Sequence, residues 1–409
     1  MKLSKKSGYL PSLDGWRAIA IVGVLLAHDR SWHIGKHSLE YVMGMGGYGV
    51  NLFFAISGFL ITTRILEEES LVGSFHIGRF YTRRLFRIQP AQFAYLFVIA
   101  VLIVSGVPHR LSFADTWHTW TASLLMYVNF LYRSGSPNLL TGHFWTLAIE
   151  EHFYLLLSLV LFFVKKQRAI VLVALFLLFD LPMENWDALR RAGWHLGFSL
   201  PRADQWHFAP LFLAACIAVF MRFPLVLQHV KRLWKPWIVA VATIVLALLH
   251  HAFVLWKANE PIVVYRHLDG EAPMISTYLF IAWIVATVFH PQSVSTRVLE
   301  WKPIRFIGAI SYSLYLWHVL VFQAWHVLWA TTLDRWAAHP SAYVLFEASK
   351  FAVAILVASA SYYWLEKPLI RMGHRLAPSA TIGRPELIGI PTELPDSETS
   401  VSVRHTPPS

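Results

Sequence analysis

The sequence predicts an all-α integral membrane protein with about ten membrane-spanning helices. Apolar residues make up 56% of the 409 residues and charged residues only 14%, whereas a soluble chain carries roughly a quarter. The apolar residues fall in runs that approach the length of a bilayer crossing. Basic residues gather beside alternate runs, which is typical of cytoplasmic loops.

Several of the expected spans are shorter than the ~20 residues that a straight crossing needs, so their ends are expected to extend through flanking Trp and Tyr. The spans are 15–29, 47–66, 89–106, 144–164, 169–182, 208–221, 236–255, 274–290, 306–329 and 344–364. The segment 117–132 is apolar enough to be an eleventh. One crossing there would reverse every later loop, so we interpret it as interfacial, re-entrant or half of a folded-back pair.

The charge pattern predicts cytoplasmic N- and C-termini, with Lys5 and Lys6 before the first span. Residues 1–376 are expected to form one membrane domain. Residues 377–409 are rich in Pro, Ser, Thr and Glu and lack apolar periodicity, so a disordered cytoplasmic tail is expected there. The net charge of +11 is explained by these topology signals and by anionic headgroups, so no nucleic-acid partner is expected.

The first expected span carries two ionisable residues, Arg17 and His28, on one helical face. Eleven residues at about 100° each complete three turns plus roughly 20°, and they separate the two by about 16 Å. Such groups are costly at membrane depth and usually face a cavity. The alternatives are a snorkelling anchor for Arg17 and an interfacial histidine capped by Asp29 for His28.

A cluster of three arginines, Arg83, Arg84 and Arg87, precedes the third span, with Arg83 and Arg87 on one helical face. Guanidinium groups suit bidentate phosphate contacts, so the cluster could hold the phosphates of a soluble donor. The alternative is an amphipathic entry that binds lipid headgroups.

Two carboxylates begin the fourth span. Glu151 is explained by acids favouring a helix N-terminus, whereas Glu150 is explained less well and shares a face with Tyr154. Ser57 and Gly58 favour close helix packing. His318 is most simply a hydrogen-bonded structural histidine, and the other histidines lack ligand spacing, so no metal is expected.

These motifs together resemble the acyltransferase-3 family of integral-membrane acyltransferases. The matches occur in order from residue 13 to residue 368. The departures are Trp16, where Leu is frequent, and Asn51, where Asp is commoner, and neither removes a catalytic candidate. The matching stretches are Leu13–Arg17 with Arg17 and His28 at the family's Arg-x10-His spacing, Gly49–Phe59, Arg83–Pro90, Trp145–Glu150, Tyr312–His318 and Glu366–Pro368.

The resemblance implies a multi-pass O-acyltransferase of the bacterial cytoplasmic (inner) membrane. Its donor is expected to be acetyl-CoA or another acyl-CoA, and its acceptor a hydroxyl of a cell-envelope polysaccharide, lipopolysaccharide, lipid-linked sugar or macrolide-like glycoside. Many members carry a fused extracytoplasmic domain; none is seen here, so direct transfer or a separate partner is expected. The implied catalytic residues are His28, Arg17 and Glu150, the implied donor-binding residues are Arg83, Arg84 and Arg87, and the implied supporting residues are Asp14, Asp29, Trp145, Tyr154 and His318.

In this interpretation the donor's phosphates lie at the arginine cluster, the pantetheine arm passes Arg17, and His28 acts as general base. Glu150 or Asp29 could orient the His28 tautomer. The competing class is a proton-coupled transporter of a glycan or acyl compound, because such carriers also contain intramembrane Arg and His. A transporter would move its substrate without consuming acyl-CoA. A non-catalytic scaffold is the third alternative.

Overall fold

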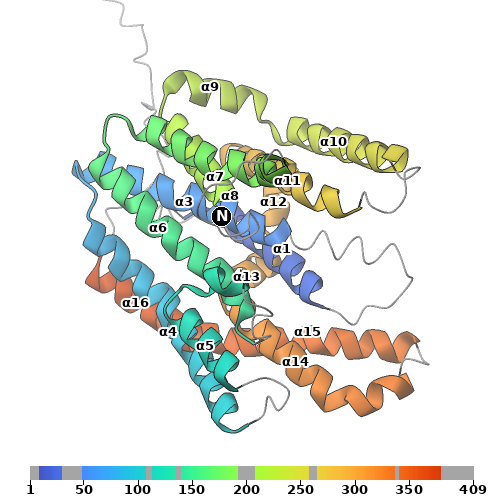
Figure 1. Cartoon of the computed structure of the whole chain (residues 1–409). Coiled ribbons are helices and arrows are strands. Elements are labelled where there is room, and N and C mark those ends of the chain that lie inside the picture. Colours follow the sequence, from blue (N-terminus) through green and yellow to red (C-terminus); the bar gives the residue numbers. More distant parts are fainter. Residues whose placement is uncertain are drawn as a thin grey trace, which may run out of the picture.

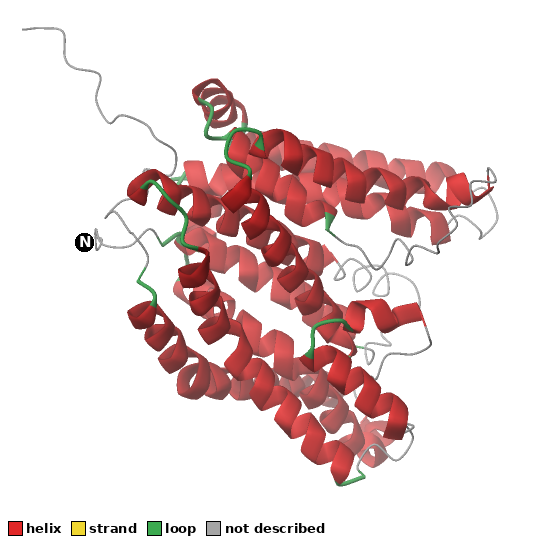
Figure 2. Cartoon of the chain, turned by 60° about the vertical axis from the view of Figure 1, so that its left-hand side comes forward, coloured by secondary structure: helices red, strands yellow, loops and turns green. Residues whose placement is uncertain are grey.

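The computed structural model is helical throughout the part of the chain that it describes, with no strand there (Figures 1 and 2). The described residues are 9–29, 48–106, 113–133, 140–191, 208–257, 265–336 and 340–378. Only the backbone is described for 113–115, 132–133, 180–191, 250–257, 265–275, 329–336 and 340–343. The all-α prediction is therefore confirmed for these ranges, whereas most of the expected tail, 379–409, lies outside them.

The helices follow one another with short connections where the chain is described (Figure 1). They are α1 (Pro11–His28), α3 (Tyr48–Val72), α4 (Ile77–Val104), α5 (Phe113–Leu124), η1 (Val128–Arg133), η2 (Gly142–Phe144), α6 (Trp145–Phe163), α7 (Arg168–Arg191), α8 (Ala209–Phe220), α9 (Pro224–Leu233), α10 (Pro236–Lys257), α11 (Tyr265–Phe289), α12 (Val294–Leu299), α13 (Lys302–Ala309), α14 (Ser311–Trp336), α15 (Pro340–Ser361), the π-helical turn η4 (Tyr362–Glu366) and α16 (Lys367–Leu376).

Every predicted span falls largely on helical residues, although 306–329 is divided between α13 and α14, and the count of about ten spans is not confirmed. Four described stretches are long and apolar enough to cross a membrane: Tyr48–Val72, Ile77–Val104, Gly142–Phe163 and Val344–Leu376. The number rises to six if each bent pair is one span, with a bend of 111° between α8 and α9 and of 68° between α13 and α14. In α1 the polar first turn leaves an apolar part, Ala18 to Ala27, only ~15 Å long.

The segment 117–132, which was expected not to cross alone, is divided between α5 and η1. A turn separates them, and Met126 adopts a left-handed φ of 59° there. The 12 residues of α5 extend over only ~18 Å, well short of the ~30 Å hydrocarbon core. The interfacial location itself stays a prediction.

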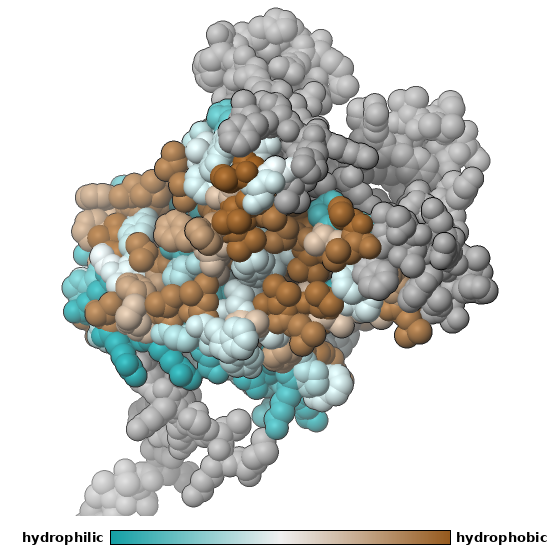
Figure 3. All heavy atoms as spheres, turned by 90° about the horizontal axis from the view of Figure 1, so that it is seen from below, coloured by the Kyte–Doolittle hydropathy of each residue, from teal (hydrophilic) through white to brown (hydrophobic). Residues whose placement is uncertain are grey.

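One face of the helix array carries several apolar patches among more polar residues (Figure 3), and exposed apolar side chains occur on α4, α14 and α15. On α4 the exposed residues Phe93, Phe97, Val101 and Val104 recur at helical spacing, so they form one outward stripe. An exposed apolar stripe of this kind suits contact with lipid.

The helix α1 lies inside the array, packed against α3, α12, α13 and α14 (Figure 1). Two glycines allow this close approach. A Cβ on Gly308 of α13 would lie 1.8 Å from the carbonyl oxygen of Asp14, and one on Gly49 of α3 would lie 2.4 Å from that of Ala20. The backbone positions of Asp14 and Arg17 are therefore fixed by helices distant in the sequence.

Replacing Gly308 with alanine is expected to lower the thermal unfolding midpoint and the membrane abundance of the protein. The new methyl group cannot fit beside Asp14 without a backbone shift, and overpacking costs typically about 1–3 kcal/mol. Fluorescence-monitored unfolding in detergent measures the effect. Gly78→Ala is the control, because a Cβ there meets nothing within 4 Å, and an unchanged midpoint for Gly308→Ala would contradict the packing argument.

Candidate active site

A cavity of about 110 Å³ lies between α1, α3, α4, α6 and α14. Its charged groups are three arginines, Arg17, Arg84 and Arg87, and two glutamates, Glu150 and Glu151. Five of the predicted site residues line it together. The full lining is Arg17, Val50, Phe53, Phe54, Ser57, Leu60, Ile61, Arg84, Arg87, Ile88, Thr146, Leu147, Glu150, Glu151, Tyr154, Ser311, Tyr312 and Tyr315.

Two hydroxyl groups from different helices hold the carboxylate of Glu150. Ser57 Oγ donates to Oε1 at 2.8 Å, and the Tyr154 hydroxyl donates to Oε2 at 2.9 Å. Tyr154 was predicted from its spacing to Glu150. Ser57 and Gly58 were both interpreted as packing residues. Gly58 does pack closely, because a Cβ added there would lie 2.3 Å from the carbonyl oxygen of Leu211 in α8. Ser57, in contrast, lines the cavity.

Two of the three cavity arginines, Arg84 and Arg17, have a neighbour that holds the side chain. The guanidinium carbon of Arg84 lies 4.3 Å from the Tyr154 ring centroid, a cation–π contact. Arg87 lines the same cavity and remains exposed. Arg17 donates from Nη1 to Asp14 Oδ1 at 3.2 Å. Asp14 also accepts from the Tyr9 hydroxyl, and burial together with this bond raises the pKa of Tyr9, so that hydroxyl keeps its proton and donates.

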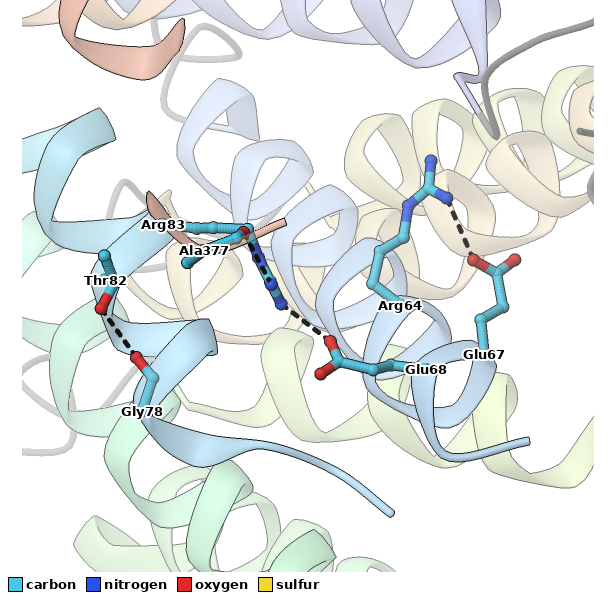
Figure 4. Close-up of polar contacts among 7 residues, drawn as sticks. All are labelled: Arg64, Glu67, Glu68, Gly78, Thr82, Arg83 and Ala377. Atoms are coloured by element: carbon cyan, nitrogen blue, oxygen red, sulfur yellow. Dashed lines mark hydrogen bonds and ion pairs between the residues drawn. The ribbon is translucent and has the colours of Figure 1, made fainter. Parts of the chain in front are cut away.

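Arg83 lies outside the cavity lining, in contrast to its two partners in the predicted cluster. Its Nη2 donates to Glu68 Oε2 at 2.8 Å and its Nη1 to the carbonyl oxygen of Ala377 at 3.3 Å (Figure 4). It thus joins α4 to α3 and to the residue after α16. No signal in the sequence separates Arg83 from Arg87, because both lie on one helical face.

His28 ends α1 away from the cavity, with an exposed side chain. Its Nδ1 lies 2.9 Å from the carbonyl oxygen of Val24, so the Nδ1–H tautomer leaves Nε2 as the proton acceptor. Its ring packs edge-on against that of buried His318, with centroids 4.9 Å apart. His318 in turn lies 5.5 Å from the ring of His143. Nothing in the sequence connected His143 with this cluster.

Tyr315 separates the cavity from the three histidines. Its side chain lines the cavity, and its ring centroid lies 5.6 Å from that of His143 and 5.7 Å from that of His318. Its hydroxyl donates to the carbonyl oxygen of His143 at 2.7 Å and lies 2.6 Å from Thr146 Oγ1. Tyr315 therefore lies between the cavity and the rings of His143 and His318, and His28 is not part of the cavity lining.

Two predicted supporting residues, Asp29 and Trp145, lie outside the cavity lining. Asp29 was considered as a partner for the His28 ring, and the structure pairs it with buried Lys350 of α15, with Oδ1 and Nζ 2.6 Å apart. Trp145 packs edge-to-face on Phe54 at 6.4 Å and is not part of the cavity lining. Among the described residues, no group of three or more His, Cys, Asp or Glu is arranged to hold a metal ion.

Comparison with known proteins agrees with these motifs. The acyltransferase-3 model, described as an acyltransferase domain, matches residues 10–363. The chain belongs to this family. With its membrane-capable helices, this membership makes it a multi-pass membrane protein and a member of a family of acyltransferases, as the resemblance implied.

The curated relatives are similar over most of this chain. OatA, an O-acetyltransferase of Staphylococcus aureus strain NCTC 8325 / PS 47, is 28% identical over 392 residues. A Staphylococcus aureus strain COL protein provisionally named as an O-acetyltransferase, SACOL0978, is 28% identical over 396 residues. Each alignment covers 90% of this chain, and the chain spans 58% of the length of each relative. No solved structure matches the chain.

Proposed function

We propose that this acyltransferase-3 protein moves an acetyl group from acetyl-CoA, or another acyl group from its CoA thioester, to a hydroxyl of a cell-envelope glycan. The observation that carries the proposal is the gathering of Arg17, Arg84 and Arg87 with Glu150 in one cavity. The O-acetyltransferase names of the relatives support the O-acetyl part of the reaction.

The donor's phosphates are assigned to Arg84 and Arg87. Both guanidinium groups face the cavity, and their planar donor sets match phosphate oxygens. The three cavity arginines outnumber the two glutamates, so the site attracts an anion. Glu150, held by Ser57 and Tyr154, keeps the Tyr154 ring beneath Arg84 and so orients that guanidinium.

The cavity is suited to the narrow arm of the donor. Its volume of about 110 Å³ is several times the ~10–15 Å³ that one water molecule needs on this measure, so it suits a short chain segment of the donor. The nucleotide end is therefore assigned to the cytoplasmic mouth near Arg84 and Arg87, and the thioester to the end near Tyr315. Movement of the Tyr315 side chain would join the cavity to the histidines.

His28 is assigned as the general base. Its Nε2 takes the proton of the acceptor hydroxyl, whose oxygen attacks the thioester carbonyl carbon. The carbon–sulfur bond then breaks, and the departing CoA thiolate receives the proton from the imidazolium. The exposure of His28 allows an acceptor sugar to approach from outside the helix array, and buried His318 supports the ring from behind.

Transfer of radiolabelled acetyl groups tests the proposal. Membrane vesicles that contain the protein are expected to release free CoA from acetyl-CoA and to accumulate base-labile label on envelope glycan, and vesicles without it are not. Mass spectrometry of the glycan locates the ester. Movement of glycan across the membrane without loss of acetyl-CoA would instead establish a transporter.

A further inference from the structure

Three charged side chains lie buried together just beyond the C-terminal end of α1. Lys350 Nζ is 2.6 Å from Asp29 Oδ1 and 2.5 Å from Glu347 Oε2, and all three side chains are at most 1% exposed. Lys350 and Glu347 belong to α15, whereas Asp29 is the C-cap residue of α1. Lys350 therefore ties α1 to a helix more than three hundred residues later in the chain (Figure 1).

This arrangement is not explained by the local stability of α1. The C-terminal end of a helix carries partial negative charge, so an aspartate there is unfavourable unless a cation compensates it. Burying the ions also costs several kcal/mol each, and loss of one partner leaves an uncompensated charge. The ion pair between Asp29 and Lys350 therefore fixes the position of the C-terminal end of α1.

Lys350 supports His28 by two routes. Asp29 directly follows His28, so the ion pair fixes the backbone that carries the imidazole. Lys350 Nζ also lies 4.9 Å from the ring centroid of Phe322, and that ring packs edge-on at 5.9 Å against His318. His318 is the residue against which the His28 ring rests, at 4.9 Å. Backbone and ring of His28 thus depend on the same ammonium group.

We propose that Asp29 and Lys350 are positioning residues for acyl transfer, which hold the His28 imidazole at the geometry that the proton transfer requires. The inference rests on the proposed function, in which His28 is the base. A displacement of about 1 Å in a catalytic group can lower a rate by ~100-fold. The ion pair acts on the transfer step and leaves donor binding, which lies at the other end of α1, unaffected.

Two single substitutions at the triad test this inference as a matched pair. Asp29→Asn removes the link to α1 and leaves Lys350 paired with Glu347. Glu347→Gln removes the link within α15 and leaves Lys350 paired with Asp29. Each variant loses one buried negative charge, so the remaining pair has the same net charge in both. Asp29→Asn is expected to lower kcat by about 10- to 100-fold with an unchanged KM for acetyl-CoA, and Glu347→Gln to stay within about threefold of the parent protein.

A rescue variant and a double variant distinguish a positioning role of Asp29 from a general effect on the stability of the protein. Asp29→Glu is expected to recover most of the lost kcat, and Asp29→Asn to cause no further loss when His28 is already alanine. Equal kcat losses in Asp29→Asn and Glu347→Gln with parallel falls in unfolding midpoint would overturn the inference, as would full activity of Asp29→Asn. Full activity of His28→Ala alone would instead refute the base assignment in the proposed function.

Discussion

Substitution of His28 by alanine is expected to lower the rate of acetyl transfer by ~10²–10⁴-fold, which is the usual contribution of a general base. The abundance of the protein in the membrane is expected to stay normal, because the His28 side chain is exposed at the end of α1. Its removal therefore leaves no buried void. Release of CoA from acetyl-CoA, with ester formation on the glycan, measures the effect at equal protein amounts.

His229→Ala is the matched control for this prediction. His229 is also exposed on a helix, and its Nδ1 lies 2.7 Å from the carbonyl oxygen four residues earlier, as in His28. It lies on α9, away from the cavity and the histidine cluster. The control is expected to keep full activity. Normal transfer by the His28 variant at normal abundance would refute the assignment of the base.

The paired substitution of Arg84 and Arg87 by alanine is expected to raise the dissociation constant for acetyl-CoA by ~100-fold or more. Each charge-assisted hydrogen bond to a phosphate contributes about 1.5–3 kcal/mol, and the double variant removes at least two. Because neither residue lies near His28, kcat at saturating donor is expected to change much less. Binding of acetyl-CoA to the purified protein, measured by calorimetry at two salt concentrations, gives both the loss and its electrostatic origin.

Two other arginines serve as controls for this prediction. Arg371→Ala removes an exposed cation from α16, outside the cavity lining, and is expected to leave donor affinity unchanged. Arg83→Ala removes the bonds to Glu68 and to the Ala377 carbonyl oxygen, so it is expected to lower the unfolding midpoint and not the affinity. Unchanged donor binding in the Arg84 and Arg87 double variant would identify those residues as headgroup anchors.

The helical architecture was largely predictable from the sequence, because apolar runs and flanking charges act locally. The predicted spans fall largely on helical residues, with α3 and α4 as examples, whereas 306–329 is divided between two helices. The number of crossings was not, because bends such as the 111° turn between α8 and α9 depend on what the helices pack against. In the same way, the break at Met126 divides an apolar segment that the sequence shows as continuous.

The candidate site was predicted in part. Arg17, Arg84, Arg87, Glu150 and Tyr154 were all named from their motifs, and the structure brings them to one cavity. Arg83 was grouped with them, because sequence spacing shows which residues share a helix face but not which neighbour that face meets. Ser57, Thr146 and Tyr315 received no catalytic role, since each acts through a partner on another helix.

The sequence by itself determined that this chain is an all-α membrane protein of the acyltransferase-3 family and that Arg17 and His28 share a face of its first helix. Periodicity, hydropathy and ordered motifs carry that information locally. Only the tertiary structure decided that Tyr315 lines the cavity while His28 does not, and that Asp29 pairs with Lys350. The physical reason is that both depend on contacts between helices far apart in the sequence, which local spacing cannot specify.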